Sequence, residues 1–240
     1  LEGRAVRLAA PPVPVAPLEA HAYQGHPAAT WASAGRLVVA WEDRRAGHTR
    51  LFHSYRDPTA GFMPERQLNE HNAPPPGEAG EPGLGSGVMR VMLASDTQGA
   101  VRAIWLDKRN PASAYAVWGA ASNDGGRTFG ANGIVQDDLG SAVPQWHAAL
   151  AGGKGGFVAA WDDTREAWGD ESEPGDVILS AIQGATWSDD LVVPVASGEG
   201  YQGSPAVALG PEGELHLVWI ERDHLSAPTR LFHVSARRPH

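Results

Sequence analysis

The sequence predicts an all-β protein built from four copies of one unit, and two observations lead to that fold class. In four segments a tryptophan closes an apolar run and is followed by acidic residues and arginine. These segments are RLVVAWEDRR (36–45), AVRAIWLDKR (100–109), GFVAAWDDTR (156–165) and ELHLVWIERD (214–223). In addition, no segment of a dozen residues has the 3.6-residue apolar period of a helix. A repeated β-unit is therefore expected.

The predicted strands follow one another in the same order within each repeat. A small-residue strand comes first, as HPAATWA (26–32), VMRVMLA (88–94), QWHAALA (145–151) and SPAVALG (204–210). A glycine-bearing turn joins it to the tryptophan strand, which is the pattern of a β-hairpin. A third strand follows as TRLFHSYR (49–56), SAYAVWGAAS (113–122), DVILSAI (176–182) and TRLFHVSAR (229–237). Three repeats add a fourth, as FMPERQLN (62–69), ANGIVQD (131–137) and DLVVPVA (190–196).

Four such units predict a β-propeller of four four-stranded antiparallel blades in a single domain, residues 1–240. The last repeat lacks a fourth strand, and GRAVRLAA (3–10) has the character of one. We expect this N-terminal strand to pair beside residues 229–236 and close the last blade, which removes free sheet edges. Half of an eight-bladed dimer and a fragment of a six-bladed protein are the competing architectures.

The first and last repeats are more alike than the repeat pattern requires. Both contain Thr-Arg-Leu-Phe-His, at 49–53 and 229–233, and both contain Tyr-Gln-Gly, at 23–25 and 201–203. Two shared strings at corresponding positions indicate a true internal repeat and not a chance match.

Charge and composition exclude several classes of function. The formal net charge is −9 and there is no run rich in lysine and arginine, whereas nucleic-acid binding needs a basic surface. The chain has no cysteine, which excludes disulfides and thiolate metal sites. No apolar run approaches the ~18 residues of a membrane span. We therefore expect neither a nucleic-acid partner nor a transmembrane segment.

One loop between a third and a fourth strand has the sequence SNDGGRTF (122–129). It resembles the Asp box, Ser-x-Asp-x-Gly-x-Thr-Trp/Phe, of the sialidase-like, BNR-repeat β-propeller family. The other repeats keep only parts of it, at 56–58 and 185–188. The resemblance implies a structural role for the box and a ligand site on the opposite face. We expect a secreted, periplasmic or cell-surface protein, and the start at Leu1 instead of Met fits removal of a signal peptide.

On the predicted ligand face, fourfold repetition brings polar side chains towards one central mouth. The candidate ligand-binding residues are Asp43, Arg44, Asp107, Arg109, Asp163, Arg165, Glu221, Arg222, Gln24, His26, Gln145, His147 and Gln202. Arginines can hold carboxylates with two hydrogen bonds. Because acid–arginine pairs recur in every repeat, a structural tie between loops fits them better than a binding role. The two histidines and the insertions 71–87 and 166–176 break the repeat and carry more functional weight.

These residues predict a binding protein and not an enzyme, and we assign no catalytic residue. A sialidase-type enzyme uses three arginines, a tyrosine with a glutamate, and an aspartate. This chain has only four tyrosines and lacks a convincing Arg-Ile-Pro motif. We expect a non-catalytic propeller that binds a carbohydrate or another polar extracellular ligand. A sialidase-like glycoside hydrolase is the first alternative, and a scaffold that docks a partner protein is the second. We expect no cofactor, apart from a structural cation that carboxylates near the central axis could hold.

Overall fold

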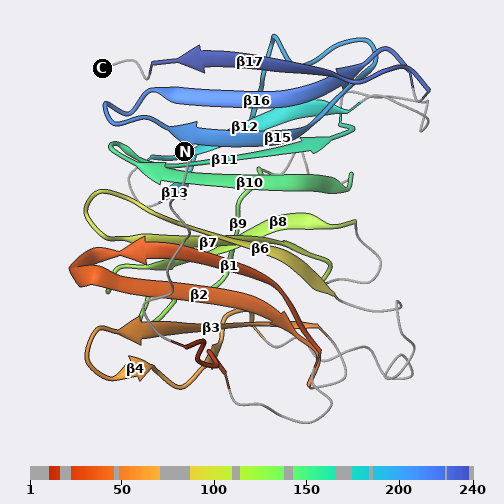
Figure 1. Ribbon diagram of the computed structural model, residues 1–240. Coiled ribbons are helices and arrows are strands. Elements are labelled where there is room, and N and C mark those ends of the chain that lie inside the picture. Colours follow the sequence, from red (N-terminus) through yellow and green to blue (C-terminus); the bar gives the residue numbers. More distant parts are fainter. Residues whose placement is uncertain are drawn as a thin grey trace, which may run out of the picture.

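The computed structural model describes residues 11–16, 23–45, 49–70, 87–109, 114–137, 143–165, 175–183, 186–224 and 226–237. In this part of the chain the only helical element is one 3₁₀ turn, Ser33–Gly35. The strands form four antiparallel sheets, called sheets I to IV here (Figure 1). The near absence of helix confirms that expectation from the sequence.

Each sheet is built from one repeat, in chain order. Sheet I contains β1 (Gln24–Ala32), β2 (Arg36–Asp43), β3 (Arg50–Asp57), β4 (Gly61–Phe62) and β5 (Arg66–Gln67). Sheet II contains β6 (Val88–Ser95), β7 (Val101–Asp107), β8 (Ala116–Ser122) and β9 (Gly133–Ile134). Sheet III contains β10 (Gln145–Gly153), β11 (Gly156–Asp163), β12 (Asp176–Gln183), β13 (Thr186–Trp187) and β14 (Leu191–Val192). Sheet IV contains β15 (Tyr201–Leu209), β16 (Leu215–Arg222) and β17 (Arg230–Ala236).

The four sheets are stacked in chain order, from sheet I in orange to sheet IV in blue (Figure 1). Their first strands form a row in which β1 packs beside β6, β6 beside β10, and β10 beside β15. Among the described strands no comparable packing joins β1 with β15, so this row does not close into a ring. The predicted closing strand, residues 3–10, lies outside the described residues.

The predicted tryptophans Trp41, Trp105, Trp161 and Trp219 are all buried, at equivalent places in the four sheets. We call the face that carries this tryptophan the tryptophan side of a sheet. The other face is its leucine side, named after Leu51 of sheet I. Alternate residues of a strand point to opposite faces, so the two sides are read directly from the register.

The hydrophobic core consists of three seams, each between two successive sheets. In the first, Trp105 of sheet II packs with Ala40 and Leu51 of sheet I. In the second, Trp161 packs with Ile104 and Val117, and in the third, Trp219 packs with Ala160 and Val177. Every seam thus joins the tryptophan side of one sheet to the leucine side of the sheet before it.

The SNDGGRTF loop forms a turn at the end of β8, beside the start of β7 and away from Asp107. Asp124 accepts hydrogen bonds from the Ser122 hydroxyl at 2.8 Å, from the Thr128 hydroxyl at 2.6 Å and from the backbone N–H groups of Arg127 and Thr128. Partial burial raises the pKa of this carboxyl, but these hydrogen bonds outweigh it and hold the pKa at about 2. The aspartate therefore serves the local turn, as expected from the sequence.

The seams predict how stability responds to loss of one tryptophan. Trp161→Ala removes a ring that is fully buried between sheets II and III, and should lower the free energy of unfolding by about 3–5 kcal/mol. Leu191→Ala, at an exposed position, is the control and should change it by about 0.5 kcal/mol or less. Denaturant titration measures both. Equal effects of the two substitutions would contradict the described packing.

Candidate functional site

In sheets I, II and III the aspartate two residues after the buried tryptophan is held by a local tie. The indole Nε1 of Trp105 donates to Asp107 Oδ2 at 3.0 Å, and Arg109 donates to the same oxygen at 2.7 Å. The Arg109 guanidinium also lies over the Trp118 ring. Sheets I and III repeat the arrangement, with Trp41, Asp43 and Arg45, and with Trp161, Asp163 and Arg165. Because all these aspartates are buried, their geometry is that of a structural tie.

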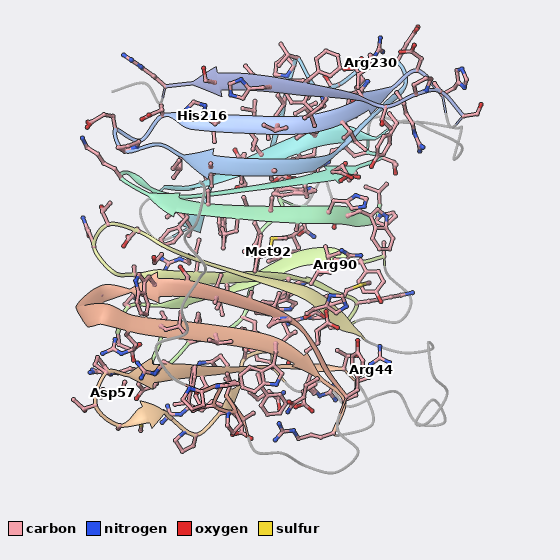
Figure 2. All side chains as sticks on the ribbon, viewed as in Figure 1. Arg44, Asp57, Arg90, Met92, His216 and Arg230 are labelled. Carbon is pink, nitrogen blue, oxygen red and sulfur yellow. The ribbon has the colours of Figure 1, made fainter. Side chains whose placement is uncertain are left out.

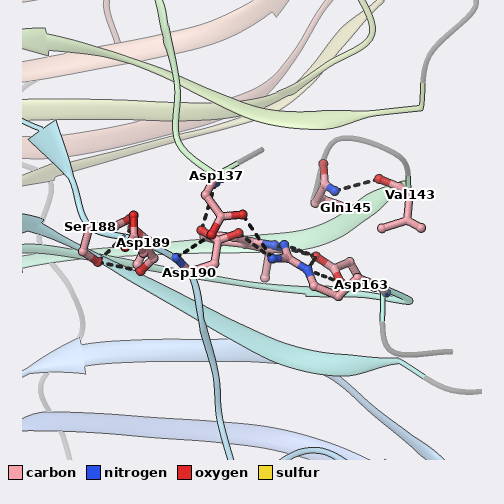
Figure 3. Close-up of polar contacts among 10 residues, drawn as sticks. Asp137, Val143, Gln145, Asp163, Ser188, Asp189 and Asp190 are labelled. Atoms are coloured by element: carbon pink, nitrogen blue, oxygen red, sulfur yellow. Dashed lines mark hydrogen bonds and ion pairs between the residues drawn. The ribbon is translucent and has the colours of Figure 1, made fainter. Parts of the chain in front are cut away.

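Arg165 extends its tie to a pair of aspartates, Asp137 and Asp190, which Figure 3 shows beside Asp163. Its Nη1 lies 2.7 Å from Asp190 Oδ2 and 3.6 Å from Asp137 Oδ1. The two aspartates accept each other's backbone N–H groups at 3.1 and 3.2 Å. Burial raises the pKa of Asp190 to about 6, although Arg165 opposes the shift. This network joins the connection after β9 to the segment before β14.

Each predicted glutamine donates to a group of its own sheet or of the segment that leads into that sheet. Gln145 donates to the Val143 carbonyl at 2.6 Å (Figure 3), and Gln202 donates to the Glu199 carbonyl at 2.9 Å. Gln24 donates to Asp43 Oδ2 at 3.2 Å.

The remaining predicted acid and arginines lie at the same end of the sheets as the tied aspartates. Glu221 is 3.5 Å from Arg230. Arg44 and Arg222 are equivalent residues of sheets I and IV, and each places its guanidinium over a tyrosine ring, Tyr23 and Tyr201. Figure 2 shows Arg44, Arg90 and Arg230 at this end, with Asp57 and His216 at the other end.

The first strand of every sheet contains a bulge at one corresponding position. The residues there are His26, Arg90, His147 and Ser204, with φ between 46° and 57°. Positive φ costs free energy for residues other than glycine, and it re-aims the side chain and the N–H group. Two of the four, His26 and His147, belong to the predicted site. Arg90 and Ser204 are not among the candidate ligand-binding residues.

Two of these bulges are bound by a carboxylate across a seam. Glu42 of sheet I accepts the Arg90 N–H of sheet II at 2.7 Å. Asp162 of sheet III accepts the Ser204 N–H of sheet IV at 3.1 Å. Leu106 and Ile220 occupy the equivalent positions of sheets II and IV, so these acids are not part of the fourfold pattern. Unlike the tied aspartates, they lie on the leucine side.

Around Asp162 the seam between sheets III and IV gathers three kinds of polar group. His147 Nδ1 lies 2.9 Å from Asp162 Oδ1, so this nitrogen carries the proton that the carboxylate accepts. The Tyr201 hydroxyl donates to Oδ2 at 3.3 Å and lies over Gly203, where a Cβ would clash with it. The Asp162 hydrogen bond raises the pKa of His147, whereas burial and the positive charge of Arg90 lower it.

An aromatic pair lies next to this cluster. Trp146, which pairs with Asp162 across β10 and β11, has an exposed ring tilted against Tyr115 with centroids 5.4 Å apart. Burial raises the pKa of Tyr115, and the negative charges of Asp107 and Glu42 raise it further. The structure therefore brings carboxylate, imidazole, phenol and indole groups of sheets II, III and IV close together. We call Asp162, His147, Tyr201, Trp146 and Tyr115 the mouth cluster.

The described residues contain no group of three or more His, Asp or Glu side chains that could hold a metal ion. A cation near the axis stays a prediction. In the same part of the chain no helix is long and apolar enough to cross a membrane.

Comparison with known proteins relates the fold to carbohydrate-active enzymes. No family model and no curated protein sequence matches the chain. An α-L-arabinanase from Penicillium chrysogenum, solved with arabinobiose, is similar in structure, with a TM-score of 0.55 and 16% identity over 90% of this chain and 63% of that one. The GH93 α-L-arabinofuranosidase of Fusarium graminearum, also with arabinobiose, has a TM-score of 0.54 and 16% identity over 89% and 62%.

A Hadza microbial sialidase, Hz136, has a TM-score of 0.55 and 16% identity over 88% of this chain and 44% of its own. At such identities the likeness shows the fold alone, which is of the β-propeller kind. The chain spans between 44% and 63% of the length of these three structures.

The mouth cluster predicts how His147 titrates. Because Asp162 raises its pKa above the ordinary 6.5, the pair stabilises the fold fully below that value, and this contribution is lost as pH rises through the folded-state pKa. In Asp162→Asn the pKa should fall below 6.5, because burial and Arg90 then act unopposed. NMR titration of the ring, assigned with His147→Gln, measures the shift. An unchanged pKa in Asp162→Asn would contradict the contact.

Proposed function

We propose that the protein binds a carbohydrate at the mouth cluster without transforming it. The observation that carries the proposal is the contact of His147 and Tyr201 with one buried carboxylate, Asp162, beside the exposed Trp146 ring. Sugar hydroxyls both donate and accept hydrogen bonds, and their C–H faces pack on aromatic rings. A charged acceptor, an imidazole and a phenol next to an indole meet both needs.

The structural relatives support a carbohydrate ligand through their fold. Two of them were solved with arabinobiose bound. Because this chain spans less than two thirds of the length of these relatives, an activity like theirs is only a proposal for this protein. A polar extracellular ligand agrees with the expectation that the protein acts outside the cytoplasm, and the SNDGGRTF turn agrees with a sialidase-like repeat.

A glycoside hydrolase is the second candidate, and one observation favours it. Glu42 and Asp162 occupy the same position of sheets I and III, and glycoside hydrolysis commonly uses a pair of carboxyl groups. We prefer binding because each carboxylate already accepts a backbone N–H of the next sheet. Such a bond gives both acids a structural role.

Binding is tested by titrating arabinobiose and sialyllactose into the protein in a calorimeter. Trp146→Ala should weaken binding of the accepted sugar about tenfold, since loss of an aromatic contact costs about 1.4 kcal/mol. Trp31→Ala is the matched control, because it removes an exposed tryptophan from β1 at the other end of the sheet. Unchanged affinity in both Trp146→Ala and His147→Gln, or no binding of either sugar, would contradict the proposed site.

The same sugars separate binding from hydrolysis. Chromatography of the incubated sugars should show no cleavage products. Release of monosaccharide that is abolished in both Glu42→Gln and Asp162→Asn would replace the binding proposal with the hydrolase.

A further inference from the structure

The leucine side of sheet IV has no sheet packed on it within the described chain, although its residues match those of buried faces. In each sheet, the residue that follows the repeated tryptophan pairs with a residue of the third strand. In sheets I to IV that partner is Leu51, Val117, Val177 and Leu231. The first three are 0% exposed, whereas Leu231 is 74% exposed. An aliphatic side chain is thus kept at an interface position where no neighbour covers it.

The repeated string Thr-Arg-Leu-Phe-His sharpens this contrast, because identical residues differ only in their neighbours. In sheet I, Leu51 lies in the first seam, and His53 is buried with its ring edge-on to Phe129 of the sheet II turn. In sheet IV the equivalent His233 is exposed, and its Nε2 lies 3.1 Å from His216 Nδ1. The segment that sheet II covers in the first copy is therefore open in the last copy.

The tryptophan side of sheet I is the second face without a neighbouring sheet, and it is open at its Leu37 end only, since Trp41 is itself 5% exposed. Val39, two residues before Trp41, is only partly buried, whereas its equivalents Ala103, Ala159 and Leu217 are fully buried in seams. Trp31, which pairs with Leu37 on this same side, is 64% exposed. An exposed tryptophan beside the partly buried Leu37 and Val39 is an apolar patch of the kind found at interaction surfaces.

These two faces are the two halves of a seam. Each internal seam joins a tryptophan side to the leucine side of the sheet before it. Sheet I offers the open Leu37 end of its tryptophan side, and sheet IV offers an open leucine side. Within one chain they do not meet, because β1 and β15 lie at opposite ends of the row (Figure 1).

We propose that the protein associates with a second copy of itself, head to tail, through a fourth seam. The tryptophan side of sheet I in one copy packs on the leucine side of sheet IV in the next, as in the three internal seams. Such a contact is heterologous, so it either closes as a ring or continues as an open array. Closure after two copies gives eight sheets, within the range of known propellers.

The test uses the whole chain with one charge on each open face. Leu231→Glu and Trp31→Glu each place a carboxylate in the fourth seam, and both side chains are exposed, so neither should lower the melting temperature of the monomer appreciably. Val195→Glu changes an exposed apolar residue in the segment between β14 and β15 and is the control. Sedimentation velocity over a dilution series measures the species present.

The wild type and Val195→Glu should associate at high concentration, and Leu231→Glu and Trp31→Glu should each stay monomeric. A one-to-one mixture of those two variants should form a dimer and nothing larger. In that pair, the intact sheet IV of Trp31→Glu meets the intact sheet I of Leu231→Glu.

Several outcomes would overturn the proposal. A monomeric wild type at all concentrations means that the open faces do not bind a second copy. Persistent dimers of Trp31→Glu alone mean that sheet IV of one copy packs on sheet IV of another. A mixture that stays monomeric rules out the head-to-tail contact.

Discussion

The packing of each tryptophan side on the leucine side of the preceding sheet is the constraint on which the rest of the structure depends. An antiparallel sheet must bury at least one apolar face, and here the inner sheets II and III bury both. The seams fix the spacing and direction of the first strands. They thereby set one sheet's carboxylate beside the next sheet's bulge, and this is how the mouth cluster comes to span three repeats.

Backbone strain and site geometry meet in the same residues. A non-glycine residue at positive φ costs on the order of 1–3 kcal/mol, and this conformation occurs at the equivalent position of all four first strands. At Arg90 and Ser204 the N–H freed by the bulge is accepted by Glu42 or Asp162 of the neighbouring sheet. The hydrogen bond to a charged acceptor offsets part of the strain. The bulge at His147 instead turns its imidazole to the Asp162 carboxylate.

The sequence was sufficient to place the first three strands of each sheet, the buried tryptophans and the turn at Asp124, because each depends on a local pattern; the predicted fourth strands are only two-residue strands such as β9 and β14. It also suggested that the acid–arginine pairs are structural. It did not reveal the roles of Glu42 and Asp162, since both stand beside tied aspartates in acid-rich strings. Strand alternation separates the two kinds of acid: Trp161 and Asp163 share one side, and Asp162 points to the other.

The bulges were beyond sequence reasoning for a different reason. His26, Arg90 and His147 are not typical turn residues, and the bulge conformation is held by packing and hydrogen bonds and not by local propensity. Tyr115 was likewise missed, because it approaches Trp146 only when sheets II and III stack. The open row of sheets is also a tertiary property, since four similar repeats are equally compatible with a closed ring.

The central claim is that the mouth cluster is held across the seam by the Asp162 carboxylate. Amide hydrogen exchange at Ser204 tests it most directly, because this N–H has Asp162 as its acceptor. The amide should be protected in the folded wild type and lose that protection in Asp162→Ala, while Arg90, bound by Glu42, keeps its own. A Ser204 amide that exchanges equally fast in both proteins would contradict the claim.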